Sequence, residues 1–357
     1  MTDVPSRRRL LKWLLAAGTA AAAGAAVFLP RKANAYYTGP VSDHFDGERF
    51  FNPGGRGTKS FGQLAKLYTQ ETWSTWPDSV PGLPPDRPPR EVTGARARIV
   101  HIGHASWLLQ TGGQNILIDP VWSQRAGPYN IIGPMRANPP GVAFDDLPPI
   151  HVVLVTHNHY DHFDIATLAR LQQRDKPRFV MPLGNDAILR AEIGELAATA
   201  VDWGQVTELS PQVGVFAEPT QHWSARGTRD RMHALWASFV ITTPAGKIYA
   251  IGDTGFGDGR TFRQVALRHP KVRLALIPIG AYEPRWFMGD QHINPVEAVS
   301  ALELSGAQAA LGHHWGTFRL TAEPHDQPPA DLAKALADRG HAPERFQPAR
   351  PGLVTEI

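Results

Sequence analysis

The chain has 357 residues, of which 42% are apolar, so it can form one large domain or two ordinary ones with a substantial core. It contains no cysteine, which excludes disulfide bonds and thiolate metal sites and leaves histidine, aspartate and glutamate as the strong metal ligands. Once residues 1–35 are set aside, 30 basic and 32 acidic residues remain, a net charge of −2 that argues against a nucleic-acid partner.

Residues 1–35 have the pattern of an export leader. A twin-arginine motif at residues 6–12 (Ser-Arg-Arg-Arg-Leu-Leu-Lys) precedes an alanine-rich apolar segment at 13–29. Residues 33–35 (Ala-Asn-Ala) then form a small-x-small cleavage site, so we expect cleavage after Ala35 and a periplasmic mature protein. The alternative is an uncleaved leader that tethers the protein, although its alanines and glycines make a weak membrane span.

Residues 36–95 are rich in proline, glycine and aromatic residues, which predicts an irregular N-terminal arm with one short helix near 61–69. From residue 96 to residue 357 we predict one domain of alternating strands and helices. Strands are predicted at 97–102, 107–110, 115–118, 152–155, 178–181, 213–218, 235–242, 247–251, 274–279 and 307–311, and helices at 164–173, 186–193, 260–269, from Pro295 onward, and at 331–339. This order predicts two β-sheets packed face to face with helices outside.

A dense group of polar side chains directly follows the apolar strand 152–155. Residues 156–162 (Thr-His-Asn-His-Tyr-Asp-His) hold three histidines and one aspartate within six positions, at the rim of a sheet. Imidazole and carboxylate together suit borderline divalent metals, zinc first, and iron or manganese would fit most of the same ligands. The alternative is a polar loop with incidental histidines, which the density of ligand-type residues disfavours.

Three other predicted strand ends carry ligand-type residues: His222, Asp253, and one of His313 and His314. Because side chains alternate along a strand, only one of the last two should point inward. Together with the central group they can form two metal sites that share one bridging carboxylate. The expected division is His157, His159 and His222 for the first ion, Asp161, His162 and His314 (or His313) for the second, and Asp253 for both.

Each candidate also has a purely structural explanation. Asp253 could cap the turn at 252–255 (Gly-Asp-Thr-Gly), and His222 could be a satisfied core histidine. Asp119 either orients a ligand imidazole from behind or starts a turn. If two ions bind, a hydroxide between them becomes a nucleophile at neutral pH, because coordination lowers the pKa of bound water to about 7. Two ions roughly 3.5–4 Å apart can also bind the attacking and leaving oxygens of a displacement at phosphorus.

The motif at 157–162, with the later His222, Asp253 and His314, resembles the metallo-β-lactamase superfamily, whose fold is an αββα sandwich with the metals at one edge. Further stretches are similar to the N-acyl-phosphatidylethanolamine-hydrolysing phospholipase D family. They are residues 103–105 (Gly-His-Ala), 118–120 (Ile-Asp-Pro), 147–150 (Leu-Pro-Pro-Ile), 221–223 (Gln-His-Trp), 252–255, 278–288 (Pro-Ile-Gly-Ala-Tyr-Glu-Pro-Arg-Trp-Phe-Met), 291–292 (Gln-His) and 314–318 (His-Trp-Gly-Thr-Phe). The similarity covers roughly residues 45–350, and the run at 278–288 is its most specific part.

The resemblance implies two zinc ions per chain, with His314 rather than His313 as a ligand. It also implies hydrolysis of a phospholipid on the head-group side, which yields phosphatidic acid and an N-acylethanolamine. Gln291 and His292 match residues near the family's substrate phosphate, and with Tyr160 they are the expected substrate-binding residues. We expect Asp161 to accept a proton from the hydroxide and His292 to stabilise charge on phosphate oxygens. The leaving group's proton comes from His292 or from a metal-bound water.

Two other functions stay open on the sequence alone. A metal-dependent lactonase or small-molecule phosphodiesterase of the same fold would use the same hydroxide. A non-catalytic periplasmic metal-binding protein is the weaker alternative, because the set of seven ligands is intact. Arg285 pairs with a phosphate or, more simply, anchors a loop. The apolar residues 286–288 face acyl chains, as peripheral membrane contact would require, or form a homodimer contact.

Overall fold

The computed structural model describes residues 34–55 and 59–357. Residues 36–357 form a compact unit that separates from residues 1–35. The predicted export leader therefore lies almost wholly outside the described residues, and the boundary expected between residues 95 and 96 stays a prediction. Within the described part of the chain, no helix is long and apolar enough to cross a bilayer.

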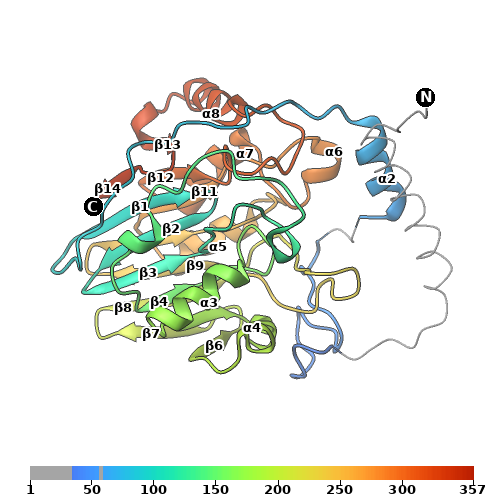
Figure 1. Ribbon diagram of the computed structural model, residues 1–357. Coiled ribbons are helices and arrows are strands. Elements are labelled where there is room, and N and C mark those ends of the chain that lie inside the picture. Colours follow the sequence, from blue (N-terminus) through green and yellow to red (C-terminus); the bar gives the residue numbers. More distant parts are fainter. Residues whose placement is uncertain (1–33, 56–58) are drawn as a thin grey trace, which may run out of the picture. The chain divides into compact units, whose positions relative to one another are not determined.

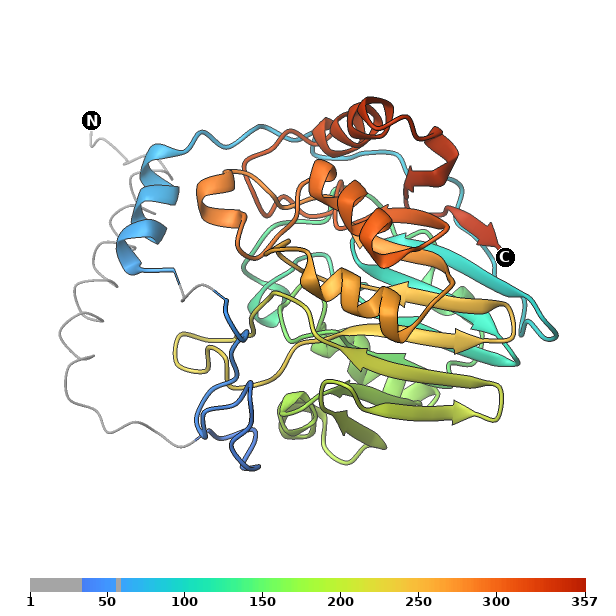
Figure 2. The same ribbon diagram turned by 180° about the vertical axis from the view of Figure 1, so that it is seen from behind.

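Within the described residues, the strands form two mixed seven-stranded sheets that lie face to face (Figures 1 and 2). The first sheet has the order β14 (Val354–Glu356), β1 (Ala97–Gly103), β2 (Ser106–Thr111), β3 (Gln114–Ile118), β4 (Val152–Leu154), β5 (Arg178–Pro182), β6 (Ala198–Val201). The second has the order β13 (Phe346–Pro348), β12 (Ala309–His313), β11 (Val272–Pro278), β10 (Gly246–Ala250), β9 (Ser238–Thr243), β8 (Val213–Glu218), β7 (Val206–Ser210).

In each sheet, four neighbouring strands pair in antiparallel fashion and the pairing then continues in parallel. In the first sheet, β2 and β3 are joined through Gly112 and Gly113, which both have positive φ (54° and 74°), a backbone conformation that glycine adopts without strain. From β3 to β6 the strands are parallel; a long loop connects β3 to β4, and helices provide the two later crossovers. The second sheet is antiparallel from β7 to β10 and parallel from β10 to β13.

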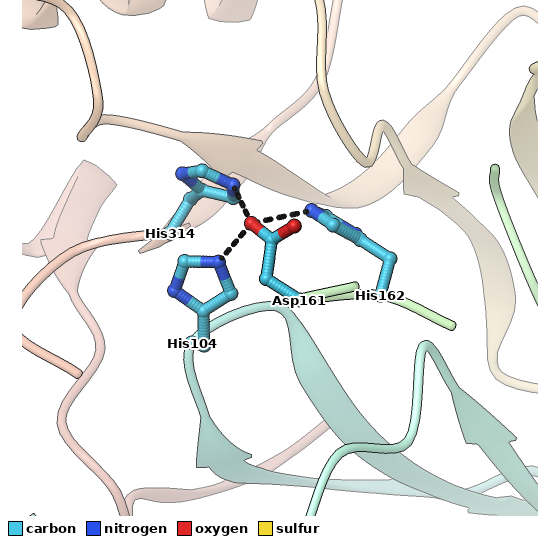
Figure 3. A group of neighbouring side chains, drawn as sticks. All are labelled: His104, Asp161, His162 and His314. Atoms are coloured by element: carbon cyan, nitrogen blue, oxygen red, sulfur yellow. Dashed lines mark hydrogen bonds and ion pairs between the residues drawn. The ribbon is translucent and has the colours of Figure 1, made fainter. Parts of the chain in front are cut away.

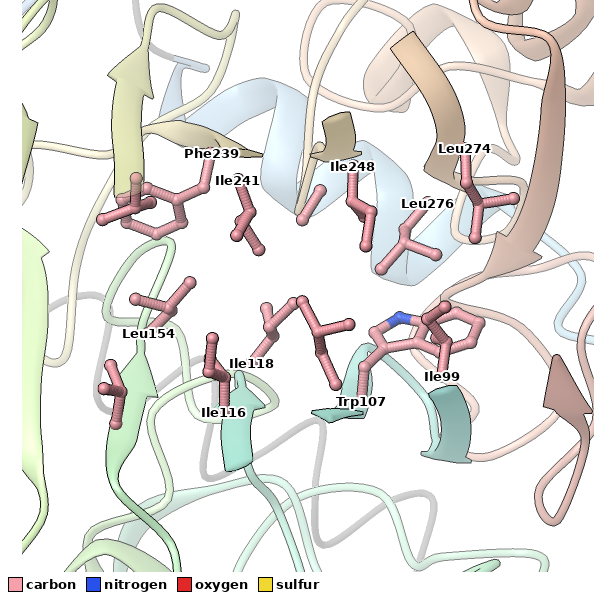
Figure 4. Close-up of a cluster of buried hydrophobic side chains, with 14 of the residues drawn as sticks. Ile99, Trp107, Ile116, Ile118, Leu154, Phe239, Ile241, Ile248, Leu274 and Leu276 are labelled. Carbon is pink, nitrogen blue, oxygen red and sulfur yellow. The ribbon is translucent and has the colours of Figure 1, made fainter. Parts of the chain in front are cut away.

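The main core lies between the two sheets (Figure 4). Alternate side chains of each strand point inward, as a half-buried strand requires. The labelled residues of the first sheet are Ile99, Trp107, Ile116, Ile118 and Leu154, and those of the second are Phe239, Ile241, Ile248, Leu274 and Leu276. This apolar layer holds the two sheets, and hence their edges, in fixed relative positions.

Helices cover the outer face of each sheet. On the first sheet, α3 (Ile165–Arg174) and α4 (Asn185–Ile193) bury their apolar sides in a second core. On the second sheet, α5 (Arg260–Arg268), α7 (Pro295–Ser305) and α8 (Gln327–Asp338) do the same in a third. Helix α7 begins with Pro295 at its first position, as expected, and Asn294 caps it. The predicted αββα sandwich is therefore confirmed.

The described residues of the N-terminal arm, 36–55 and 59–95, contain one helix, α2 (Phe61–Gln70), which Ser60 caps. Asn52 ties this arm to the site edge, because its amide nitrogen donates to the carbonyl of His222 at 2.8 Å. Elsewhere in the described part of the chain, the short helices are α6 (Arg285–Met288), η1 (Pro128–Asn130), η2 (Phe144–Asp146) and η3 (Pro343–Arg345).

The sequence prediction missed β6, β7, β13 and β14. The last two have three residues each, which is too few to carry a periodic signal. Strands β6 and β7 lie at sheet edges and are partly exposed, which removes the apolar pattern on which the prediction depends. The predicted strand at 235–242 begins only at Ser238, because Leu235 and Ala237 donate instead to Leu183 and Thr156.

Candidate metal centre

The predicted ligands meet at one edge of the sandwich, just after the ends of four strands. Residues 157–162 follow β4, His222 follows β8, Asp253 follows β10 and His314 follows β12. The first sheet thus supplies the ligands at 157–162, and the second sheet supplies His222, Asp253 and His314. Of the seven predicted ligand side chains, His159 is half-buried and the other six are buried.

The first group consists of His157, His159, His222 and Asp253, whose ligand-type atoms all lie within 4.8 Å of one another. Nε2 of His157 and Nε2 of His222 lie 2.9 and 3.2 Å from Nδ1 of His159. Both Nε2 atoms also face Oδ2 of Asp253, at 3.7 and 3.5 Å. Three imidazoles and a carboxylate around one point match the donor set of a borderline divalent ion.

The second group consists of His104, Asp161, His162 and His314 (Figure 3). Oδ2 of Asp161 lies 2.9 Å from Nε2 of His104, 3.3 Å from Nε2 of His314 and 3.6 Å from Nε2 of His162. Asp253 reaches this group as well, with Oδ1 3.0 Å from His314 and Oδ2 3.3 Å from His162. Its carboxylate therefore lies between the two groups, where the sequence placed a bridging ligand.

The donor atoms fit metal ions better than they fit one another. Nε2 of His162, Nε2 of His314 and Oδ1 of Asp253 are buried and, among the described residues, make no aligned hydrogen bond. Buried polar atoms without such partners are costly, and those in native proteins call for a specific explanation. Divalent ions bound by the two ligand groups would satisfy all three atoms. The residues present therefore fit the metal ions that the sequence predicts.

Asp119 supports the histidines from behind. Its Oδ2 lies 2.7 Å from Nδ1 of His162, and its two oxygens accept from the amide and hydroxyl of Thr156, both at 2.7 Å. Oγ1 of Thr156 in turn lies 2.9 Å from Nδ1 of His157. A partner at Nδ1 fixes the ring and leaves Nε2 for the ion. Of the two roles that the sequence left open for Asp119, the structure shows the orienting one.

The charges of the site favour metal binding. Burial, together with neighbouring imidazoles, holds the pKa of His157 well below its usual value, and burial lowers the pKa of His159 and of His222 to about 3. Burial raises the pKa of Asp253, but His314 and His162 outweigh it and hold that pKa well below the usual value. Neutral imidazoles and ionised carboxylates are the forms that ligate.

Two histidines behave differently. Burial lowers the pKa of His314, but the carboxylates of Asp253 and Asp161 outweigh it and raise the pKa to about 9. Burial also lowers the pKa of His162, but the carboxylates of Asp253 and Asp161 outweigh it and raise this pKa well above its usual value. Both rings therefore carry a proton at neutral pH that an arriving cation must displace.

The expected substrate residues lie close to the site but do not act alike. His292 is buried and its Nε2 lies 3.9 Å from Oδ2 of Asp253, so it borders both groups. Gln291 contributes its backbone carbonyl, which accepts from Nδ1 of His222 at 3.0 Å. The hydroxyl of Tyr160 points to the carbonyl of Arg226, 2.7 Å away, and its ring lies under that guanidinium. Tyr160 thus fastens a loop.

His313 and His314 point in different directions, as expected, although His314 lies just after β12 with a positive φ of 65° and not within the strand. His314 turns toward Asp253, whereas His313 packs edge-on against Trp107 inside the sandwich, with ring centroids 6.1 Å apart. Arg285 anchors a loop, since it donates to the carbonyl of His292 and to the carboxylate of Glu297, both at 2.8 Å.

His104 is the site residue to which the sequence analysis gave no role. It follows the end of β1 and bonds Asp161 directly. The signal that could have found it is the one used for the other ligands, namely a histidine just after a strand, here within Gly103-His104-Ala105.

Comparisons with known proteins agree with this geometry. A model of the beta-lactamase superfamily domain matches residues 114–315. The N-acyl-phosphatidylethanolamine-hydrolyzing phospholipase D 1 of Caenorhabditis elegans is 35% identical over 245 residues, which span 66% of this chain and 68% of that protein. The mitochondrial protein of that name from Saccharomyces cerevisiae is 31% identical over 251 residues, spanning 67% of this chain but only 53% of the yeast protein.

Among solved structures, the metallo hydrolase Igni18 of the hyperthermophilic archaeon Ignicoccus hospitalis superposes with a TM-score of 0.54 at 19% identity. The superposition covers 73% of this chain and 98% of that protein, which shows a shared fold. The chain therefore belongs to the metallo-β-lactamase superfamily and is a metal-dependent hydrolase of that fold.

Proposed function

We propose that the chain is a zinc-dependent phosphodiester hydrolase of the phospholipase D type. Its substrates would be lipids like N-acyl-phosphatidylethanolamine, and its products phosphatidic acid and an N-acylethanolamine. The observation that carries the proposal is the pair of ligand groups that meet at Asp253, since two ions suit displacement at phosphorus. The names of the nematode and yeast relatives supply the lipid class.

In this proposal His157, His159 and His222 would hold one ion, Asp161, His162 and His314 would hold the other, and Asp253 would be a ligand that both groups share. When bound, two such ions would lower the pKa of water to about 7 and neutralise charge on the phosphate. His104 and Asp119 orient ligands from outside, His104 through Asp161 and Asp119 through His162.

Two further side chains of the site, His292 and Asp161, have distinct roles that follow from their protonation states. Burial lowers the pKa of His292 to about 3, so the ring is neutral and can donate to a phosphate oxygen without competing as a cation for the site. Burial raises the pKa of Asp161, but His162 and His104 outweigh this effect and hold the pKa well below its usual value. Asp161 is therefore ionised, and its carboxylate can accept a hydrogen bond or the proton of an attacking water.

The test is incubation of purified residues 36–357 with N-acyl-phosphatidylethanolamine, with and without a chelator, followed by mass spectrometry of the products. Phosphatidic acid that forms only without chelator supports the proposal, and elemental analysis of the active protein identifies the metal. The variant His157→Ala should lose hydrolysis while its circular dichroism spectrum stays unchanged. Absence of lipid turnover together with rapid opening of a soluble lactone would replace the proposal by a lactonase.

We also propose that the protein acts in the periplasm after export and cleavage behind Ala35. The support is the twin-arginine motif at residues 6–12. The double variant Arg7→Lys/Arg8→Lys should keep the protein in the cytoplasm, and mass spectrometry of the exported wild type should give Tyr36 as its first residue. An intact leader on membrane-bound protein would instead show tethering.

A further inference from the structure

One arginine close to the metal centre has no partner for its charge. Nε and Nη2 of Arg231 are buried and, among the described residues, make no hydrogen bond. Burial lowers the pKa of Arg231 and the guanidinium of Arg49 lowers it further, whereas no carboxylate of the described part of the chain raises it. Arg49 itself faces Glu48 at 3.6 Å. A guanidinium keeps its charge at every physiological pH, so a largely buried one calls for an anion.

The carboxylate next to Arg231 in the chain is engaged elsewhere. Residues 226–231 contain three arginines and a single acidic residue, Asp230. The two oxygens of Asp230 accept from the amides of Arg226 at 3.0 Å and of Gly227 at 2.8 Å. This carboxylate therefore closes the turn of its own loop and does not neutralise Arg231.

Trp223 connects Arg231 with the accessible side of the metal centre. The guanidinium carbon of Arg231 lies 3.8 Å from the centre of the Trp223 ring. The same indole packs edge-on against His159, with ring centroids 4.3 Å apart. His159 is the half-buried member of the seven predicted ligands, so a substrate can approach the first ligand group from this side. Arg231 thus lies one indole ring away from that approach.

The backbone around Arg231 holds this stack in place. The amide of Met232 donates to the carbonyl of Ser224 at 2.8 Å, and the hydroxyl of Ser224 donates to the carbonyl of Ala234. The amide of Phe50 donates in turn to the carbonyl of Met232 at 2.8 Å. The guanidinium is therefore positioned before any ligand arrives, which reduces the entropy lost on binding.

The stacked arrangement leaves the donors of Arg231 for an oxyanion. Trp223 covers a face of the guanidinium, while the N–H groups point outward in its plane. The side chain as a whole is half-buried, so Nη1, which is not among the enclosed nitrogens, faces the surface. Carboxylate and phosphate oxygens match this planar fork of donors.

We propose that Arg231 is a specificity-determining residue, which binds a second oxyanion of the substrate while the phosphodiester lies at the metal centre. The inference deepens the proposed function and rests on it. The diacylglycerol half of a phospholipid carries no charge, so the second oxyanion belongs to the head group. The substrate class is therefore phospholipids whose head group carries a carboxylate or a second phosphate.

The experiment compares two pairs of lipids whose members differ by one oxyanion. N-acyl-phosphatidylserine and N-acyl-phosphatidylethanolamine differ by a carboxylate, and phosphatidylglycerol phosphate and phosphatidylglycerol differ by a phosphate. For the metal-loaded protein, kcat/KM should favour the charged member of at least one pair by about tenfold or more, chiefly through KM, since the contact lies away from phosphorus. The pair that shows the preference identifies the oxyanion.

The variant Arg231→Gln should lose most of this preference, and Arg231→Lys should keep part of it, because the charge remains but the fork of donors is lost. The matched control is Arg229→Gln, which removes the same charge from an exposed side chain two positions away and should keep the wild-type preference. Because a ratio of two kcat/KM values is compared, a loss of folded protein cancels out. A wild type without preference in either pair, or an unchanged ratio in Arg231→Gln, overturns the proposal.

A binding measurement separates this proposal from the proposed function, because it needs no turnover. The metal-loaded protein is titrated in a calorimeter with soluble head groups, N-hexanoylserine against N-hexanoylethanolamine and glycerol 3-phosphate against glycerol. The wild type should bind a charged head group about tenfold more tightly than Arg231→Gln does. Protein that shows this difference yet cleaves no lipid leaves the oxyanion site standing and refutes the proposed function. Lipid cleavage with equal binding by the two proteins refutes the role of Arg231 alone.

Discussion

Oδ2 of Asp119 lies 2.7 Å from Nδ1 of His162, and both side chains are completely buried. The same carboxylate accepts two hydrogen bonds from Thr156, whose hydroxyl contacts His157. One residue outside the ligand set thus orients an imidazole in each group. The variant Asp119→Asn places an amide among donors that need an acceptor, so metal affinity should fall by about 10–100-fold.

Competition with a coloured chelator measures this affinity. Asp175→Asn is the matched control, because Asp175 accepts from the amide of Ile150 at 3.0 Å and lies in none of the ligand groups. If Asp119→Asn bound metal like the wild type, Asp119 would be a structural residue only.

Asp253 should decide how many ions bind. Its oxygens lie 3.0 Å from His314 and 3.3 Å from His162, and within 3.7 Å of two ligands of the other group. Without this carboxylate the repulsion between two cations is no longer offset, so Asp253→Ala should retain at most one ion per chain and lose hydrolysis. Elemental analysis after dialysis gives the stoichiometry, and two retained ions would refute the bridging role.

The neighbours His313 and His314 offer a sharp comparison, since both are buried but only His314 faces Asp253. His314→Ala should lose the second ion and with it hydrolysis. His313→Ala should keep the ions and activity, while its free energy of unfolding falls by roughly 1–3 kcal/mol because a buried ring is removed. Urea denaturation and metal analysis of the two variants check this, and the reversed pattern would reassign the ligand.

Metal binding should strengthen as the pH rises. Below pH 9 the metal-free His314 carries a proton, since its pKa is raised to about 9, and His162 carries a second. A cation must expel these protons, so the apparent affinity should rise by up to about tenfold per pH unit for each proton released, and level off above the higher pKa values. Calorimetry in buffers of different ionisation enthalpy counts the released protons. An affinity independent of pH would mean that neither ring is protonated in the metal-free site.

The fold could be predicted largely because its signals are local. The hairpin through Gly112 and Gly113, the apolar run of β4 and the capped start of α7 each follow from a few neighbouring residues. Strands β13 and β14 could not be found in this way, because three residues are too few to show an alternating pattern.

The convergence of the ligands was predictable for a different reason. Side chains that follow strands running in the same direction share one edge, and β4, β8, β10 and β12 all end at the edge where the ligands meet, so spacing in the sequence mattered little. His104 was missed because the direction of β1, and hence the edge at which it ends, depends on its pairing with β2 and β14. The hydroxyl of Tyr160 donates to the carbonyl of Arg226, a contact that the sequence could not predict, and the role of Tyr160 in substrate binding stays a prediction.

Both ligand groups draw on both halves of the sandwich. His162 comes from the first sheet, whereas His222, Asp253 and His314 come from the second. Cations bound there would link the two sheets, so the sheets could separate only if the ions were released, and metal binding would be coupled to folding. Starvation for metal should therefore shorten the half-life of this protein toward proteases, and its abundance in the cell should follow the supply of its ions.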